Sequence, residues 1–390
     1  MVNEQEKTTV PIPSVGADGE QPILNNSTGI ITTDSPEINS QFSEPEENFE
    51  DIQRQLDRMM NPAYLHTVTL NELYETTYPS RPPIIDGLLY PGTYLFAGAP
   101  KVGKSFLVAQ IAYHISMGHP LWGYPVNQCS ALYLALEDDY RRLQERMFRM
   151  FGVESTEHLH FATVAKQIGK GLEDQMELFL REHPDTRLII IDTMQKVREM
   201  GGEGNLYASD YDIIGKMKQF SDKHGICLLL VHHTRKQPAA DKFDMISGST
   251  GLLGCADGAF LLQKDQRTGV TAMLEVTGRD QPAQRIYLNH NQEHLSWDLD
   301  HVETNFHKVP PDPILEKINA MLTDTWKGTA TELVQLLAVD YKPNAFTRYL
   351  NVNNGRLENE YGITYQTRRT HTGRSLRRRA SKYPPYLPTS

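Results

Sequence analysis

The segment Gly98-Ala-Pro-Lys-Val-Gly-Lys-Ser105 has the spacing GxxxxGK[ST] of a phosphate-binding loop. Glycines let backbone N–H groups turn inward around a phosphate, and the helix that follows adds positive charge. Lys104 can reach the β and γ phosphates of a nucleotide, and the hydroxyl of Ser105 suits Mg²⁺. The sequence therefore predicts an ATP site formed by Gly98, Ala99, Pro100, Lys101, Val102, Gly103, Lys104, Ser105 and Phe106.

Two acidic residues end apolar runs that have the composition of buried strands. Asp192 ends the run Leu188-Ile-Ile-Ile, and we expect its carboxylate to join the magnesium shell. Glu137 ends the run after Ser130, and we expect it to polarise the attacking water. Because Thr193 follows Asp192, the base does not come directly after the magnesium carboxylate. The alternative is that Glu137 only caps a charged helix over residues 140–151.

A third apolar run, from Ile226 to Val231, ends in His232 and His233. Consecutive residues of a strand point to opposite faces, so the two imidazoles are poorly placed to share one metal. We expect one of them to sense the γ-phosphate and the other to be structural, and alternation alone does not choose between them. A purely structural pair is the alternative.

Short apolar runs alternate with amphipathic stretches from Tyr94 onward. This alternation predicts an α/β fold with a mostly parallel sheet between two layers of helices. The last runs are separated by turns without a helix, which predicts antiparallel edge strands at 258–264, 271–277, 284–288 and 294–298.

The length of 390 residues favours two folded domains. Residues 1–62 are acidic and polar, and they predict a disordered tail. The remaining chain divides into an ATPase domain (63–305), a proline-rich linker (306–314), a small basic domain (315–382) and a tail (383–390). The formal net charge of −10 argues against a protein whose whole surface is positively charged for binding nucleic acid, although basic residues dominate after Lys342.

The small domain has the order of a winged helix-turn-helix. We expect helices at 314–322, at 330–337 with Thr329 or Thr331 as the cap, and at 345–357, followed by a hairpin that turns near Thr372-Gly373. The third helix would enter the major groove of duplex DNA, while Arg377, Arg378 and Arg379 would bind phosphates. A protein-interaction module with a basic tail is the alternative.

The three cysteines, Cys129, Cys227 and Cys255, are far apart and form no CxxC pair. They predict neither disulfides nor a zinc site. No run of 18 apolar residues and no leader pattern occurs, so we expect a cytoplasmic protein without membrane contact.

Five segments carry a resemblance to a known family, in this order: GAPKVGKS, LYLALED, LIIIDT, LLLVHHTRK and GSTGLLGCADG. Through these segments the chain resembles the RepA-type replicative helicases of plasmids and mobile elements. These are AAA-family P-loop ATPases with a core like that of RecA and DnaB, and the resemblance covers roughly 88–299. It implies ATP and Mg²⁺ as cofactors. It also implies roles for Lys104 and Ser105 at the nucleotide, for Glu137 as the catalytic base, for Asp192 at the metal, and for His232 or His233 as the phosphate sensor.

The resemblance implies hexamers in which a basic residue completes the site of the neighbouring subunit. Arg279 is the best-placed arginine finger, Arg285 is the second choice, and an exposed hairpin arginine is the alternative. The polar loops at 198–210 and 236–250 are expected to face single-stranded DNA, unless they are surface loops without a role.

The sequence thus favours a ring-forming DNA helicase or translocase that acts in replication of a plasmid or mobile element. Its expected partners are single-stranded and duplex DNA, further copies of the chain, and replication or initiator proteins. The small basic domain departs from the compact RepA pattern and favours a second interpretation, a DNA-binding regulator or loader that uses ATP without unwinding. A small-molecule P-loop kinase is the third, and the position of Glu137 and the lack of an arginine-rich lid argue against it.

Overall fold

The computed structural model describes residues 57, 60–198, 206–234, 243, 246, 250–264, 269–279, 281–304, 311–367 and 374–378. The chain divides into two units, Met1–Thr67 and Val68–Ser390, and every element named below belongs to the second. The tail expected at 1–62 lies almost entirely outside the described residues, as does the linker expected at 306–314 apart from its last positions.

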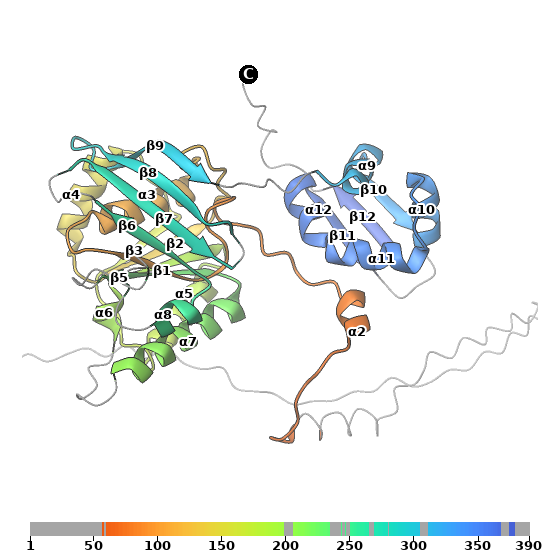
Figure 1. The fold of residues 1–390 in the computed structure, drawn as a ribbon, viewed down its shortest axis with the longest axis horizontal. Coiled ribbons are helices and arrows are strands. Elements are labelled where there is room, and N and C mark those ends of the chain that lie inside the picture. Colours follow the sequence, from red (N-terminus) through yellow and green to blue (C-terminus); the bar gives the residue numbers. More distant parts are fainter. Residues whose placement is uncertain are drawn as a thin grey trace, which may run out of the picture. The chain divides into compact units, whose positions relative to one another are not determined.

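The larger sheet has nine strands in the order β3-β2-β4-β5-β1-β6-β7-β8-β9 (Figure 1). The first six strands in this order, from β3 across to β6, run parallel. Strands β7, β8 and β9 continue the sheet in antiparallel pairs. This is an α/β fold with a mostly parallel sheet and antiparallel strands at one side, as the sequence predicts. The strands are β1 (Gly92–Gly98), β2 (Ser130–Ala135), β3 (Leu159–Ala162), β4 (Thr186–Asp192), β5 (Cys227–His233), β6 (Gly258–Gln263), β7 (Thr271–Gly278), β8 (Gln284–His290) and β9 (Trp297–Thr304).

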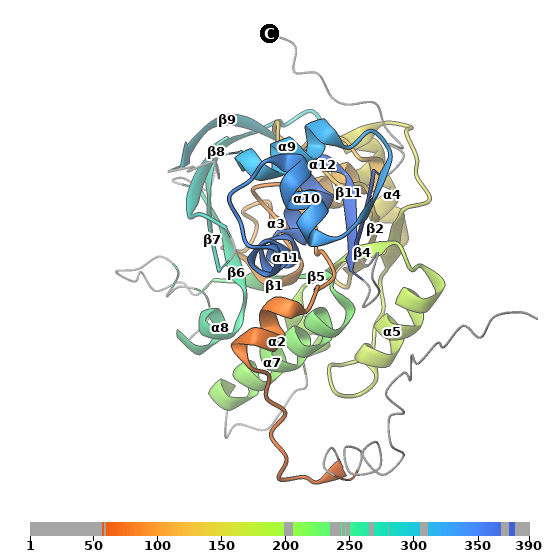
Figure 2. The ribbon, with the colours of Figure 1, turned by 90° about the vertical axis from the view of Figure 1, so that its right-hand side faces the viewer.

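Helices cover both faces of this sheet (Figure 1, and from the side in Figure 2). One apolar core joins the strands to α3 (Lys104–Met117) and α4 (Tyr140–Phe151). The other core joins them to α5 (Leu172–Glu182), α6 (Met194–Val197) and α7 (Leu206–His224). The described strand residues of β1, β2 and β5 are nearly all buried, which explains their unbroken apolar runs.

Three details differ from the sequence-based expectation, two of them in strands of the large sheet and one in a loop. Strand β6 is an interior strand that pairs parallel with β1, because α8 (Thr250–Cys255) precedes it and the chain crosses over to enter it. The last strand, expected at 294–298, is β9 (Trp297–Thr304). Residues 206–210, expected as part of a loop, begin α7.

The C-terminal region, residues 311–378, has its own core and a three-stranded sheet in the order β10-β12-β11. Thr329 caps α10, as one of the two expected caps, with its Oγ1 accepting from the N–H of Glu332. The third expected helix is broken in two at Asn353, whose Nδ2 donates to the carbonyl of Tyr349 and ends α11. The elements are α9 (Pro313–Met321), β10 (Thr325–Gly328), α10 (Ala330–Leu337), α11 (Pro343–Val352), α12 (Asn354–Tyr361), β11 (Ile363–Thr367) and β12 (Arg374–Arg378).

The basic hairpin is formed by β11 and β12, and its turn at 368–373 lies outside the described residues. Arg378 is not available for phosphate, because its Nη2 donates to the carbonyls of Asn319 and Leu322, each at 2.8 Å. Arg377 is exposed, and Arg379 lies outside the described residues. Within the described residues, no helix is both long and apolar enough to span a bilayer.

Candidate functional site

The loop between β1 and α3 has two glycines that no other residue could replace without a rearrangement. A Cβ on Gly98 would lie 2.6 Å from the carbonyl oxygen of Leu262 on β6. Gly103 has φ +108°, and a Cβ there would lie 2.7 Å from the ring of Trp297. The loop therefore runs close against β6 and β9.

Lys104 is the first residue of α3, and its side chain folds back over the loop. Its Nζ donates to the carbonyls of Gly98 (2.9 Å) and Ala99 (3.0 Å) and lies 3.1 Å from Nδ1 of His233. Burial lowers the pKa of Lys104 to about 8, although the carboxylates of Asp192 and Glu137 act in the opposite direction. The ammonium is thus held at the loop in a poorly hydrated place, where phosphate oxygens would stabilise its charge.

Asp192 ends β4 beside this loop and is only 5% exposed. Its carboxylate accepts hydrogen bonds from the hydroxyl of Ser105 and from that of Tyr133, the latter at 2.8 Å. Burial raises the pKa of Asp192, while both hydrogen bonds oppose that rise. A hydroxyl and a carboxylate in contact fit Mg²⁺, which takes few protein ligands and completes its shell with water and phosphate oxygens. When bound there, Mg²⁺ would neutralise charge on the phosphates.

Glu137 follows β2, the strand next to β4, and its side chain is exposed. Its Oε1 accepts a hydrogen bond of 3.0 Å from the hydroxyl of Thr193. The alternative role as a helix cap is wrong, because Asp139 caps α4 by accepting from the N–H of Arg142 at 2.9 Å. Asp138 is held by Arg146 at 2.6 Å. Of these three neighbouring acids, Glu137 is the one directed at the carboxyl end of β4.

The two histidines at the end of β5 separate clearly in the structure. Strand β5 lies between β1 and β4, and its register places His233 opposite Gly98. Nδ1 of His233 meets Lys104, whereas the ring of His232 is buried in the opposite direction. Burial lowers the pKa of His232 to about 4, with the charges of His233 and Arg198 adding to the effect. His233 is therefore the imidazole that faces the phosphate loop.

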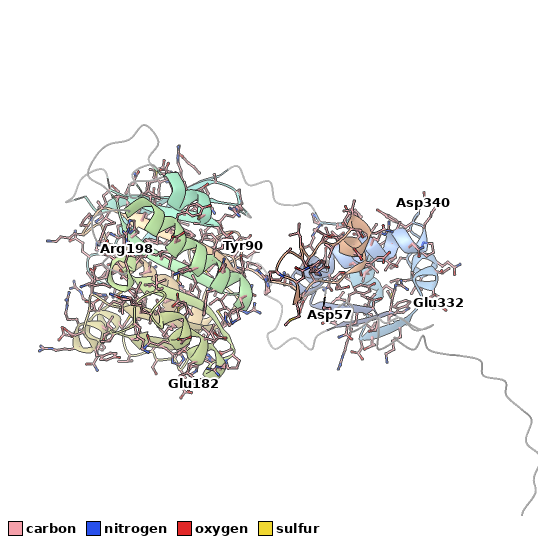
Figure 3. The ribbon with its side chains drawn as sticks, turned by 90° about the horizontal axis from the view of Figure 1, so that it is seen from below. Asp57, Tyr90, Glu182, Arg198, Glu332 and Asp340 are labelled. Atoms are coloured by element: carbon pink, nitrogen blue, oxygen red, sulfur yellow. The ribbon has the colours of Figure 1, made fainter. Side chains whose placement is uncertain are left out.

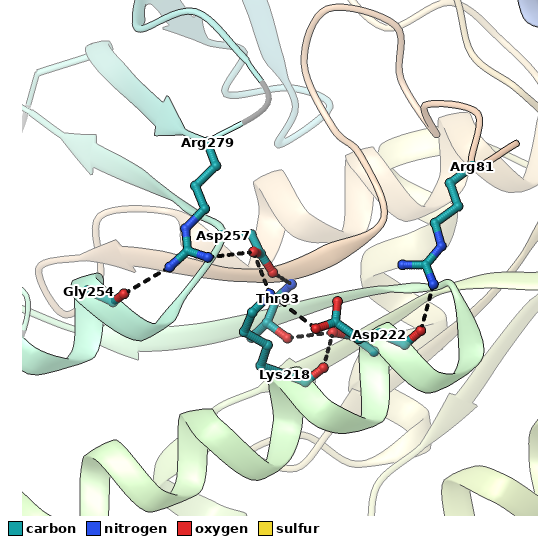
Figure 4. A network of polar contacts seen from close by, with 8 residues as sticks. Arg81, Thr93, Lys218, Asp222, Gly254, Asp257 and Arg279 are labelled. Atoms are coloured by element: carbon teal, nitrogen blue, oxygen red, sulfur yellow. Dashed lines mark hydrogen bonds and ion pairs between the residues drawn. The ribbon is translucent and has the colours of Figure 1, made fainter. Parts of the chain in front are cut away.

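Arg279 lies level with the amino ends of the parallel strands, whereas the phosphate loop of its own chain lies at their carboxyl ends. Gly278 pairs with Gly258, which pairs with Tyr94 near the start of β1, whereas the loop begins at Gly98. Four residues of strand separate the two levels by about 13 Å. The Arg279 guanidinium donates to the carbonyl of Gly254 at 3.2 Å and lies 3.8 Å from Asp257 (Figure 4). Its side chain is 57% exposed.

Asp257 holds this arginine in place through a larger network (Figure 4). Its carboxylate also accepts from Nζ of Lys218 at 2.6 Å and from the N–H of Thr93 at 2.9 Å. The second candidate, Arg285, is engaged by Glu275 at 2.9 Å. The two side chains are about equally exposed, 57% for Arg279 and 56% for Arg285, so exposure does not separate the two candidates.

The two loops expected at DNA are mostly beyond the described part of the chain. The first is described at Arg198, labelled in Figure 3, and again from residue 206, where α7 begins. Of the second, only residues 243, 246 and 250 are described. Their role at DNA stays a prediction.

Four side chains that support the site were not predicted from the sequence. Tyr133 donates to the carboxylate of Asp192, and Thr193 donates to that of Glu137. Gln110 of α3 accepts from the backbone N–H of Trp297 at 2.8 Å and donates to its carbonyl at 3.0 Å. Nε1 of Trp297 in turn donates to the carbonyl of Gly103 at 3.3 Å. The position of Tyr133 in the middle of an apolar run was the one available signal, because a buried phenol needs a polar partner.

Comparison with known proteins agrees with this geometry. A family model described as an AAA domain matches residues 60–239, which include the phosphate loop, Glu137, Asp192 and both histidines. No curated protein matches the chain. The match and the site together support a P-loop ATPase.

Solved structures with a similar arrangement share little sequence with this chain. One solved ATPase domain is 13% identical over 54% of this chain and 85% of that one, with a TM-score of 0.45. A DnaB-like replicative helicase, solved in a study of its interactions with primase, is 14% identical over 65% and 68%, with a TM-score of 0.44. A KaiC-like protein from Pyrococcus horikoshii is 13% identical over 58% and 99%, with a TM-score of 0.41. At these values the likenesses say nothing about the partners of this chain.

Proposed function

We propose that this chain is an ATP-driven motor of the RepA type, which assembles as a ring, in our view a hexamer, and moves along or unwinds DNA during replication of a plasmid or mobile element. The observation that carries the proposal is the meeting of four strand ends at one edge of the sheet. Lys104 and Ser105 follow β1, Glu137 follows β2, Asp192 ends β4 and His233 ends β5.

This arrangement supports hydrolysis of ATP rather than transfer of its phosphate to a metabolite. In the proposed step, Glu137 accepts a proton from water while the water oxygen bonds to the γ-phosphorus and the bond to the β–γ bridging oxygen breaks. Lys104 stabilises the negative charge on the phosphates, and Thr193 fixes one oxygen of Glu137. His233, which contacts Lys104, would register whether the γ-phosphate is present.

The position of Arg279 supports a ring. Arg279 lies at the amino ends of the parallel strands, away from the phosphate loop, so it cannot reach the phosphates of its own subunit. We propose that it completes the site of a neighbour. Asp257 would then be the group that aims it.

The C-terminal region favours the second candidate function, a DNA-binding regulator or loader. Its order of α9, β10, α10, the broken helix α11–α12 and the hairpin of β11 and β12 fits the order proposed for a winged helix-turn-helix. Such a region would place the ATPase on a particular duplex.

A strand-separation assay distinguishes the two candidates. Purified protein with ATP and Mg²⁺ is given a forked duplex, and its mass is followed in the same samples, with Lys104→Ala as the inactive control. The motor predicts a hexamer that separates the strands only when ATP is hydrolysed. Binding of the duplex without separation, at any oligomer size, would leave the regulator as the function.

A further inference from the structure

One face of α11 is covered by a segment that lies far away in the sequence. The segment, residues 69–77, consists of Thr69, the short helix α2 (Leu70–Glu75) and the two threonines after it. Asn351 of α11 is only 6% exposed because this segment surrounds its amide. Its Nδ2 donates to the carbonyls of Tyr74 (2.9 Å) and Glu75 (3.2 Å), and its Oδ1 accepts from the hydroxyl of Thr77 (3.2 Å).

A second side chain on the same face of α11 makes similar contacts. Arg348 lies three residues before Asn351, so both project from one side of the helix. Nη2 of Arg348 donates to Oδ1 of Asn71 at 2.9 Å and lies 3.8 Å from the carboxylate of Glu75. The segment thus meets the donors of α11 with an amide oxygen, a carboxylate and two carbonyl oxygens.

The two side chains of α11 in this contact are of the types that also bind DNA. Arginine and asparagine are the side chains that bind guanine and adenine edges in the major groove, and arginine also binds phosphate. In a helix-turn-helix the second helix enters that groove, and α11 is the helix that follows α10 and its turn. The covering segment presents the same kinds of acceptor as a DNA groove would, from a stretch with two acids and no base.

Residues 69–77, which we call the cover, are held on α11 only weakly. No residue of α2 is buried, and a helix of six residues has little stability of its own. Its hold on α11 is polar and partly solvated, with the Glu75 side chain 65% exposed. Contacts of this kind are weak when water can replace them.

We propose that residues 69–77 occupy the duplex-binding face of α11, and that duplex DNA displaces them. This inference rests on the proposed DNA role of the C-terminal region. The free protein would be held in a state with low affinity for duplex DNA, and the apparent affinity would fall in proportion to the fraction of molecules that are uncovered.

The first test is equilibrium binding of the full chain to a fluorescent duplex of about 30 base pairs and mixed sequence, long enough for two half-sites a helical turn apart, at one low salt concentration. The variant Asn71→Ala/Glu75→Ala weakens the cover without changing α11, and we expect it to bind about tenfold more tightly than the wild type. Asp340→Asn is the matched control, because it removes one negative charge from an exposed position of the same region, labelled in Figure 3. This control should bind as the wild type does.

The second test follows the segment itself by hydrogen exchange. Peptides that span residues 69–77 should exchange faster after duplex is added, and Arg348→Ala in the uncovered variant should bind duplex more weakly. If the uncovered variant and the wild type bind equally, the cover is overturned while the DNA role stands. Tighter binding without faster exchange at 69–77 would also overturn it. If neither protein binds duplex, the DNA role of the C-terminal region fails with the cover, whereas ATP hydrolysis is unaffected.

Discussion

Removing the hydroxyl of Thr193 should slow ATP hydrolysis without weakening ATP binding. Thr193 is 2% exposed and donates to Oε1 of Glu137 at 3.0 Å, so Thr193→Val removes the donor and keeps the shape. A hydrogen bond to a charged group contributes about 1.5 to 3 kcal/mol, and the exposure of Glu137 to water argues for the lower end. A loss of about 1.5 kcal/mol corresponds to about a tenfold lower kcat.

The assay is phosphate release at saturating ATP, together with equilibrium binding of ATP to the same proteins. Thr193→Ser keeps the hydroxyl and should retain most of the kcat. In a Glu137→Gln background, Thr193→Val should have little further effect, because the group that it positions is already lost. The reasoning is refuted if Thr193→Val keeps the wild-type kcat, if it loses ATP affinity instead, or if serine is as harmful as valine.

Three further predictions concern the charged groups of the two regions. Because burial lowers the pKa of Lys104 to about 8 and the charged form binds phosphate, ATP affinity should fall about tenfold between pH 7 and pH 9. Lys104→Arg, whose cation does not titrate in this range, should give a level curve, and a level wild-type curve would contradict the assignment. Subunits with Arg279→Ala and with Lys104→Ala should each be inactive alone and recover ATP hydrolysis when mixed; no recovery at any ratio would exclude an arginine acting in trans. Arg378→Ala should lower Tm by several degrees, since it removes the bonds to the end of α9, whereas Arg377→Ala should leave Tm unchanged and reduce the salt dependence of duplex binding by about one unit of slope. Equal effects of Arg377→Ala and Arg378→Ala on Tm would show that the distinction is wrong.

The strands and helices of the nucleotide site could be predicted because local rules agree with the fold there. Helix α4 has the expected bounds, Tyr140–Phe151, because Asp139 caps its start and Gly152, with φ +72°, follows its end. The phosphate loop was expected between a strand and a helix, and both are present. Capping side chains and left-handed glycines act over a few residues, so the sequence reveals them directly.

Features that depend on pairing between distant residues could not be predicted. The choice of His233 over His232 needs the register of β5 against β1, which brings Gly98 alongside. The role of Arg378 as a partner of α9 carbonyls needs the packing of β12 on the first helix of its region. A run of arginines in a sequence shows positive charge but not which way each side chain points. An arginine that supports the fold therefore cannot be told from one that binds DNA.

The break between α11 and α12 is an intermediate case. The apolar spacing continues through Asn353, and the expected helix over 345–357 followed that spacing. At Asn353 both the side-chain amide and the backbone N–H donate to the carbonyl of Tyr349, and this local cap closes the last turn of the first helix.

The most direct test of the proposed motor is ATP hydrolysis by the purified chain, with and without single-stranded DNA, measured for the wild type and for Glu137→Gln. We expect single strands to stimulate hydrolysis strongly in the wild type, and we expect Glu137→Gln to bind ATP but not to hydrolyse it. Hydrolysis that is indifferent to single-stranded DNA would contradict the motor, and full activity in Glu137→Gln would contradict the site.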